Sequence, residues 1–447
     1  MRPFHQVLAN CLLANVTNFT VWFAVTFWVF LGTRSVFATG MIAGIYLVLT
    51  AALGIWLGSI VDRTAKRTAM LGSSLVSAAF YAAGLAMALM EPAGAFADPY
   101  GAYLWAFILV VMLGVLAGNV RSIALPTLVT ILVPEERRDR ANGLVGMVTG
   151  IGFLTTSVIS GILVAYAGMP GVLALALAAS LVAFLHLSLV RLDEGRAEPS
   201  ADAPAERGGV DIAGTVRVIA AVPGLFALIL FACFNNFLGG AFMALLDAYG
   251  LSLVSVEAWG LLFGGVSTAF ILSGLVIART GLGRNPVRTL LLANVVAWSV
   301  CCVFTIQPSI WLLMAGCFVW MLLSPYAEAA EQTTLQKVVP LARQGRVFGF
   351  AQSVEQSASP LTAFLIGPLT QFVVIPFMTD GAGARSIGGW FGTGPDRGIA
   401  LVFTVAGVIG LLVTILAFFS SAYRKLSDAY ARGGDASAGR STLPGPA

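Results

Sequence analysis

The stretch Gly58-Ser59-Ile60-Val61-Asp62-Arg63-Thr64-Ala65-Lys66-Arg67 decides the fold of this chain. It places one acidic and three basic residues within six positions, between two long apolar runs that carry no charge. Charged side chains are excluded from hydrocarbon, so a group this dense marks a tight loop where two membrane-spanning segments turn around.

The composition excludes a soluble globular class. Of 447 residues, 58% are hydrophobic and only 10% are charged, far from the balance of a water-soluble domain. Many apolar runs are about 20 residues long, the length that a helix needs to cross a bilayer. The alternating pattern of β-barrel strands is absent. We therefore expect an all-α integral membrane protein.

Charge clusters and turn residues predict twelve membrane helices. Residues 141–190 contain no Lys, Arg, Asp or Glu, which is too long for one crossing at about 1.5 Å per residue. The turn sequence Gly168-Met169-Pro170-Gly171 divides them. The predicted spans lie near 8–31, 38–60, 68–90, 101–128, 143–167 and 171–190, then near 220–245, 257–279, 288–306, 309–334, 347–373 and 398–421.

These spans form two sets of six. Residues 1–190 and 220–423 are expected to be two bundles, 191–219 a flexible cytoplasmic linker and 424–447 a disordered cytoplasmic tail. With the N-terminus inside, most Lys and Arg residues become cytoplasmic, and the outer loops keep only Arg34, Arg385 and Arg397. The positive-inside rule thus predicts a multi-pass protein of the cytoplasmic (inner) membrane with both termini cytoplasmic.

The two halves also repeat in sequence. The pattern Val133-Pro134-x-x-Arg137-x-x-Arg140-x-x-Gly143 recurs from Val339 to Gly349, 206 positions later (339 − 133). The loop from Gly58 to Thr64 is echoed more loosely from Gly274 to Thr280, with Ala278 in place of the acid. Two homologous halves joined by a linker suggest alternating access to a site between them.

With these motifs, the chain resembles the major facilitator superfamily over essentially its full length. Gly58, Asp62, Arg63 and Arg67 match its signature loop between helices 2 and 3. Val133-Pro134 with Ala141-Asn142-Gly143, and Ile366-Gly367-Pro368-Leu369, resemble the branch of macrolide-efflux proteins and the enterobactin exporter. The helix-5 pattern from Gly152 to Gly161 lacks the proline of proton antiporters. The resemblance implies the major facilitator fold, with two pseudo-symmetric six-helix bundles, a transporter rather than an enzyme, and helices 1, 4, 7 and 10 around a central cavity.

Apart from Glu257, Arg279 and Arg288 at the ends of spans, four charged residues fall inside predicted spans: Arg121, Glu328, Glu331 and Glu355. A charge in a span costs about 2.5–3.5 kcal/mol on insertion scales, so each needs an explanation. The three glutamates are candidates for proton coupling, because burial disfavours the charged form of a carboxyl. Glu331 has the alternative of reaching the cytoplasmic surface. Arg121 either faces Glu328 across the cavity or holds a neighbouring helix.

Amides and a tryptophan provide candidates for the substrate cavity. Asn15, Asn18 and Trp22 form one stripe of helix 1, and Asn235 and Asn236 lie in helix 7. The alternative for such amides is hydrogen bonding between packed helices. Five cysteines and two histidines lack metal-ligand spacing, and no phosphate-binding loop motif occurs. We expect no metal, no cofactor and no ATP-driven mechanism.

The leading hypothesis is a secondary active exporter of small hydrophobic or amphipathic compounds, drug-like or siderophore-like, driven by proton antiport. The alternatives are a uniporter or importer of a small metabolite, and a non-transporting sensor or assembly protein of the same fold. The expected partners are a small-molecule substrate, protons and the lipid bilayer, with no nucleic acid and a monomeric state. The segment from Asp380 to Arg397 is expected to be a flexible external cap.

The resemblance also assigns a gating role to the signature loop, formed by Gly58, Asp62, Arg63 and Arg67. It implies that Asp62 lies near the cytoplasmic start of helix 11, around Val347 to Gly349. A carboxylate there is favoured by free backbone N–H groups and by the helix dipole. This contact would favour the outward-facing state, and Ala278 would leave the second half without an equivalent.

Overall fold

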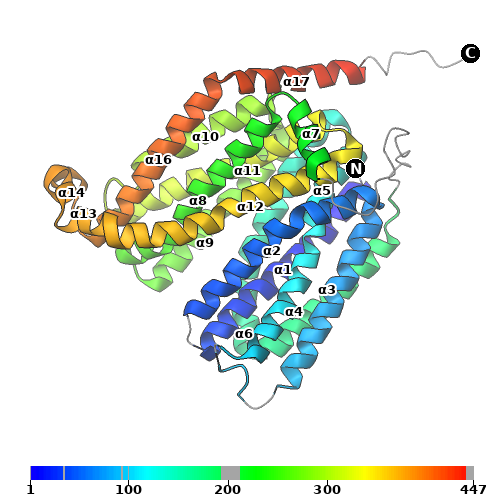
Figure 1. The fold of residues 1–447 in the computed structure, drawn as a ribbon, viewed down its shortest axis with the longest axis horizontal. Coiled ribbons are helices and arrows are strands. Elements are labelled where there is room, and N and C mark those ends of the chain that lie inside the picture. The colour runs from blue at the N-terminus through cyan, green and yellow to red at the C-terminus, as the bar shows by residue number, and fades with distance from the viewer. Residues whose placement is uncertain (1, 34–35, 92–93, 99, 193–211, 439–447) are drawn as a thin grey trace, which may run out of the picture. The chain divides into compact units, whose positions relative to one another are not determined.

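The structure is a computed structural model that describes residues 2–33, 36–91, 94–98, 100–192 and 212–438, and all regular structure in these ranges is helical (Figure 1). The helices of the first half are α1 (Arg2–Thr33), α2 (Val36–Arg63), α3 (Lys66–Leu89), α4 (Ala102–Gly118), α5 (Val120–Leu132), the 3-10 turn η1 (Glu135–Arg137) and α6 (Arg138–Leu189). Those of the second half are α7 (Ile212–Ala221), α8 (Leu225–Leu253), α9 (Val256–Thr280), α10 (Pro286–Val303), α11 (Ile310–Val338), η2 (Leu341–Arg343), α12 (Gln344–Leu369), the π-helical turn η3 (Thr370–Val374), α13 (Ile375–Thr379), α14 (Ala382–Ser386), α15 (Gly388–Phe391), α16 (Pro395–Phe419) and α17 (Ser421–Ala438).

The chain divides into two compact units with exchanged helix starts. The N-terminal unit comprises residues 1–138, 148–215 and 341–353, and the C-terminal unit comprises 139–147, 216–340 and 354–447. The start of α12 therefore packs in the N-terminal unit, and the start of α6 packs in the C-terminal unit. The exchanged segments contain residues 139–143 and 341–349 of the two repeated motifs.

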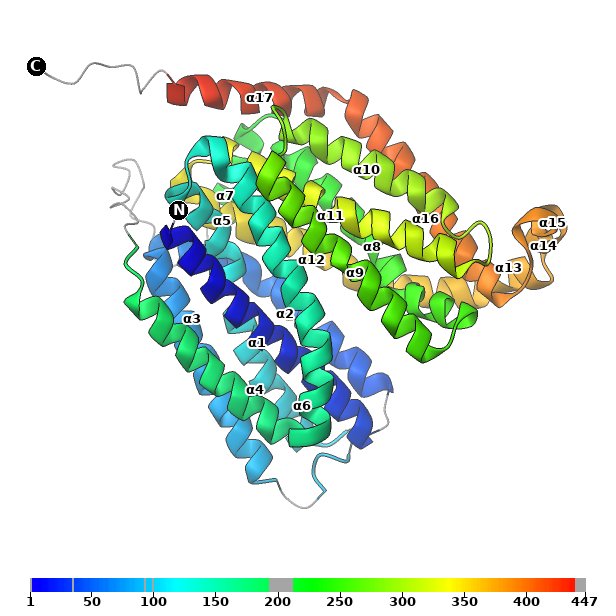
Figure 2. The same cartoon turned by 180° about the vertical axis from the view of Figure 1, so that it is seen from behind.

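In the N-terminal unit, α3 packs along α4 and α1 contacts both α4 and α5 (Figure 1, Figure 2). The core gathers large apolar side chains of α4, including Phe107 and Ile108, around the buried ring of Tyr81. The Tyr81 hydroxyl donates to Asn18 Oδ1 at 2.7 Å. Gly168 has φ +59° inside α6, a left-handed conformation that favours glycine. This is the predicted turn between the fifth and sixth spans.

In the C-terminal unit, α10 packs against α11 and α16, and α9 packs against α11. The stacked rings of Phe242 and Phe403, with centroids 4.8 Å apart, lie at the centre of its core. At one end, the buried Arg397 donates to the carbonyls of Phe391, Thr305 and Ile306. One guanidinium thus ties the segment before α16 to the end of α10.

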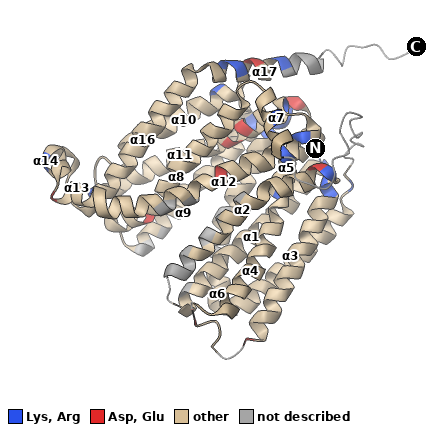
Figure 3. Ribbon diagram, viewed as in Figure 1, with Lys and Arg blue, Asp and Glu red and all other residues tan. Residues whose placement is uncertain are grey.

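Ten helices of the described residues are long and apolar enough to cross a membrane. The other two predicted spans correspond to α2 and to the part of α6 before Gly168. Figure 3 shows that the long helices are almost free of charged residues over most of their length, apart from a few acidic positions on α11 and α12. The protein is thus a multi-pass membrane protein with the predicted order of spans.

Three boundaries differ from those predicted. Residues 421–438 form α17, which contacts α10 and α11 (Figure 2), so the tail is helical up to residue 438 rather than disordered. The reason is packing: Asn285 donates to Ser427 at 2.6 Å, and Lys337 lies over the ring of Tyr430. The predicted linker lies largely outside the described residues, but its last part forms α7. The expected external loop contains α14 and α15.

Candidate functional site

A cavity of about 380 Å³ opens within the C-terminal unit, between α8, α10, α11 and α12. This volume is in the range of small-molecule sites. It combines amides, carboxyls and hydroxyls with tryptophan and aliphatic side chains. The lining comprises Phe231, Ala232, Asn235, Asn236, Gly239, Gly240, Met243, Leu290, Ala293, Asn294, Ala297, Trp298, Trp320, Leu323, Ser324, Ala327, Glu328, Glu331, Gln332, Glu355, Gln356 and Ser359.

The cavity collects all three glutamates that the sequence places inside spans. Glu328 and Glu331 are one turn apart on α11, a spacing that puts them on one helix face, and Glu355 comes from α12. Glu328 is exposed toward the cavity. Glu331 on α11 and Glu355 on α12 line the cavity together. Glu331 thus faces the cavity rather than the bilayer surface.

Two amides of α8 take different positions at this cavity. Asn235 accepts a hydrogen bond from the indole N–H of Trp298 at 2.9 Å, so it fixes a tryptophan of α10. Asn236 donates only to the carbonyl of Ala232 in its own helix, at 3.1 Å. Both predicted helix-7 residues therefore line a cavity. The sequence analysis did not single out Asn294 and Trp298 of α10, or Trp320 and Gln332 of α11, although α11 already carried its candidates Glu328 and Glu331.

The predicted residues of helices 1 and 4 lie within the N-terminal unit. Asn18 is buried and accepts from Tyr81, and Trp22 packs on Tyr46, with ring centroids 5.6 Å apart. Asn15 is half-buried. Arg121 is 2% exposed and donates to the hydroxyls of Ser73 and Ser74 on α3. Asn18 and Arg121 thus form hydrogen bonds between packed helices, which is the alternative to cavity lining that the sequence left open.

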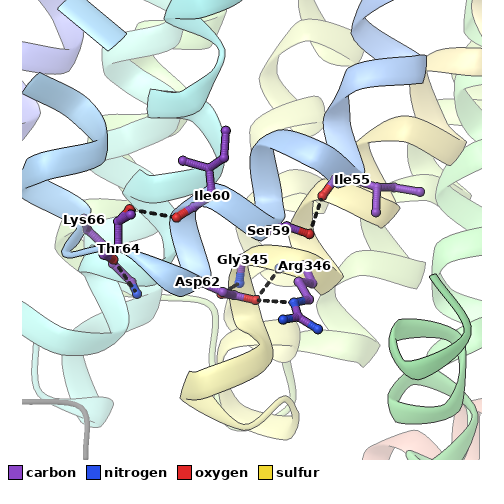
Figure 4. A network of polar contacts seen from close by, with 8 residues as sticks. All are labelled: Ile55, Ser59, Ile60, Asp62, Thr64, Lys66, Gly345 and Arg346. Carbon is purple, nitrogen blue, oxygen red and sulfur yellow. Dashed lines mark hydrogen bonds and ion pairs between the residues drawn. The ribbon is translucent and has the colours of Figure 1, made fainter. Parts of the chain in front are cut away.

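Asp62 binds the start of α12, as predicted. Its side chain is 3% exposed, and its carboxylate accepts from the backbone N–H groups of Gly345 at 2.6 Å and Arg346 at 2.8 Å (Figure 4). Because α12 begins at Gln344, these N–H groups have no acceptor in their own helix. The contact lies slightly nearer to the helix start than the sequence suggested. Asp62 thus caps a helix that is nearly 300 residues away in the chain.

Glycines bring the backbones of α2 and α12 into contact beside this cap. A Cβ atom on Gly58 would overlap the carbonyl oxygen of Gly345 and lie 3.2 Å from the Cα of Arg346. A Cβ atom on Gly349 would likewise overlap the carbonyl oxygen of Gly54. Any larger residue at these positions would separate the two helices. The close crossing of α2 and α12 therefore explains why the signature loop has Gly58 and the repeated motif has Gly349.

The bases of the signature loop have a different role. Arg67 donates to the carbonyls of Leu187 and Ser188, at the end of α6, where the last carbonyls lack helical partners. Arg63 is exposed. The loop therefore places its acid on a helix N-terminus and one of its bases on a helix C-terminus, the arrangement that helix dipoles favour.

An equivalent contact in the C-terminal unit escaped the sequence analysis. Asp139, at the start of α6, accepts from the backbone N–H of Leu282 at 2.9 Å, just past the end of α9. Gly274 lies against Gly143 there, because a Cβ on Gly274 would come within 2.7 Å of the Gly143 carbonyl oxygen. The expectation of a one-sided contact is therefore wrong. The second half also has a carboxylate contact. Its acid is Asp139 on α6, whereas the position on α9 that corresponds to Asp62 is Ala278.

Comparisons with known proteins agree with this architecture. The sequence model of the Major Facilitator Superfamily matches residues 8–363. Macrolide efflux protein A of Streptococcus pyogenes is 21% identical over 373 residues, which cover 81% of this chain and 88% of that protein.

Two solved structures share the fold at low sequence identity. A bacterial homologue of the iron transporter ferroportin, in an outward-facing state, has a TM-score of 0.68 at 16% identity and covers 93% of this chain and 99% of that chain. The human organic anion transporter MFSD10 has a TM-score of 0.64 at 15% identity and covers 93% of this chain and 100% of that chain.

Proposed function

The chain belongs to the major facilitator superfamily and is a transporter rather than an enzyme, and we propose that it exports small amphipathic compounds in exchange for protons. The observation that supports proton coupling is the presence of three glutamates, Glu328, Glu331 and Glu355, in the lining of one cavity. Carboxylates that line one cavity repel each other when all are charged, which favours uptake of a proton by the group. A proton held beside a substrate cavity can be exchanged for the substrate.

The choice of substrate class rests on the cavity lining. Its polar groups are spaced among aliphatic and aromatic side chains, a mixture that suits compounds with one polar and one apolar part. The relative named as a macrolide efflux protein supports an outward direction and places macrolides in the first panel of substrates.

The aspartate contacts provide the gates of the proposed cycle. With both termini cytoplasmic in the inner membrane, the Asp62 contact at the start of α12 and the Asp139 contact at the start of α6 are at the cytoplasmic side. We infer that both contacts form in one state of the transport cycle and break in the other. A monomer contains every group that this cycle uses.

Reconstituted vesicles test the proposal. We expect a pH gradient to drive uptake of panel compounds into inverted vesicles of the wild-type protein. Glu355→Gln should abolish gradient-driven uptake and preserve substrate exchange at equal pH, because a glutamine cannot release a proton. Glu136→Gln, at an exposed position of η1, is the matched control and should behave as wild type. Wild-type uptake that is equally fast without a gradient would overturn proton coupling.

A further inference from the structure

The cavity of the C-terminal unit carries acidic groups and no basic ones. Glu328, Glu331 and Glu355 are its ionisable lining residues, and no Lys, Arg or His occurs in the described lining. We propose that this cavity binds an organic cation that bears apolar groups; the inference rests on the proposed transport function and names its substrate class. An anion would meet only like charges here.

Two buried acceptor atoms lack a partner at the same place. Glu331 Oε1 and Gln332 Oε1, on adjacent residues of α11, are buried without a hydrogen bond. Both residues line the cavity. A buried acceptor without a donor is costly and rare in folded proteins. A ligand with N–H groups or a positive charge satisfies both atoms, whereas an anion or a pure hydrocarbon satisfies neither.

The amides of the lining present acceptors as well. Asn236 and Asn294 each use the Nδ2 group to donate to a carbonyl of their own helix, at 3.1 and 2.9 Å. Only the NH2 group of an asparagine side chain can donate this bond, so Oδ1 is the other polar atom of each side chain and can accept a hydrogen bond. The cavity therefore offers acceptors to a donor ligand from α8 and α10, in addition to the carboxyls of α11 and α12.

Tryptophans supply the surface for the apolar part of the cation. Trp298 and Trp320 line the cavity from α10 and α11. The ring of Trp298 is held by its hydrogen bond to Asn235, so it needs no reordering when a ligand binds. Indole faces attract cations more strongly than other aromatic rings do, so these side chains favour a lipophilic cation over a neutral analogue.

Cation binding is linked to release of a proton from these carboxyls. A positive charge beside Glu331 and Glu355 replaces a bound proton as the group that offsets the repulsion between the two carboxyls. The titratable groups that face the pair are Glu328 on α11 and the Cys233 thiol on α8, and α10 contributes none to the described lining. The cavity thus exchanges one positive charge for another.

Binding of a charge-matched pair of probes tests the inference. The full-length protein in zwitterionic nanodiscs is titrated with tetraphenylphosphonium and, separately, with tetraphenylborate, which has the same shape and the opposite charge. Tryptophan fluorescence is the signal. We expect saturable binding of the cation only, with its Kd raised about tenfold or more in Glu331→Gln. Glu331→Asp should retain binding, and Glu136→Gln should match wild type.

Each outcome separates this inference from the proposed function. Equal binding of both ions, or wild-type affinity in a folded Glu331→Gln protein, overturns the cation site. Proton-driven flux of neutral compounds without binding of tetraphenylphosphonium also overturns it, and leaves the proposed function standing. Selective binding of the cation by a protein without proton-driven flux supports the site and overturns the proposed coupling.

Discussion

The crossing of α2 and α12 gives a sharp prediction, because Gly58→Ala adds one methyl group where no room exists. That methyl group would overlap the carbonyl oxygen of Gly345 and contact the Cα of Arg346. Both contacts are to backbone, which cannot move aside as a flexible side chain does. We therefore expect α12 to shift away from α2 and the bonds of Asp62 to lengthen.

The magnitude follows from the size of the overlap. Overpacking by one methyl group costs about 1–3 kcal/mol, which weakens the closed contact by about 5- to 150-fold at 1.4 kcal/mol per tenfold. Gly72→Ala on α3 is the matched control, since nothing lies within 4 Å of its added Cβ. An alanine there is expected to be neutral or to stabilise the helix by up to about 1 kcal/mol.

Hydrogen–deuterium exchange measures this effect directly. The backbone N–H groups of Gly345 and Arg346 are protected by Asp62, so their exchange should accelerate in Gly58→Ala and not in Gly72→Ala. Thermal unfolding of both variants shows whether the fold survives. Wild-type exchange at these two amides in folded Gly58→Ala would refute the crossing.

Four further outcomes are expected. Asp62→Asn places an amide donor against a backbone N–H, so turnover in vesicles should fall while tetraphenylphosphonium affinity stays constant; lost affinity with normal turnover would contradict this. Asp139→Asn should speed exchange of the Leu282 amide and leave that of Gly345 unchanged. Arg397→Gln removes buried hydrogen bonds of a charged group, each worth about 1.5–3 kcal/mol, so the melting temperature should fall by several degrees; an unchanged value would argue against the tie before α16. Saturating tetraphenylphosphonium should alter exchange at Gly345 and Arg346 in the wild type, and this response should disappear in Glu355→Gln.

The sequence alone was sufficient to predict features that depend on hydrophobicity or that repeat along the chain. Long uncharged runs predicted the spans, Gly168 predicted the turn inside α6, and the two copies of the Val-Pro motif indicated two homologous halves. The contact of Asp62 could be predicted because the resemblance to a family motif added to the preference of a carboxylate for a helix N-terminus.

The rest depended on contacts between distant residues. The helix α17 has few apolar residues, and it is held by Asn285 and Lys337 from other helices. Asp139 could not be predicted because the repeat aligns Asp62 with Ala278 of α9, whereas the acid lies on α6. Glu331 and Glu355 come from two different helices, so no spacing along the chain reveals that they line the same cavity. The stripe of Glu328, Glu331 and Gln332 on α11 was the available signal for the cavity.

The helix α12 carries residues of both features that the proposed transport cycle uses. Its start carries the amides that Asp62 binds, and Glu355 follows ten residues after Gly345 (355 − 345) in the same helix. At about 1.5 Å per residue these points are roughly 15 Å apart along the helix. Because one helix carries both groups, we expect a displacement of its start to displace Glu355 as well. Coupling between two sites is reciprocal, so binding of the proposed cation at Glu355 should alter the stability of the Asp62 contact to the extent that this contact alters cation affinity.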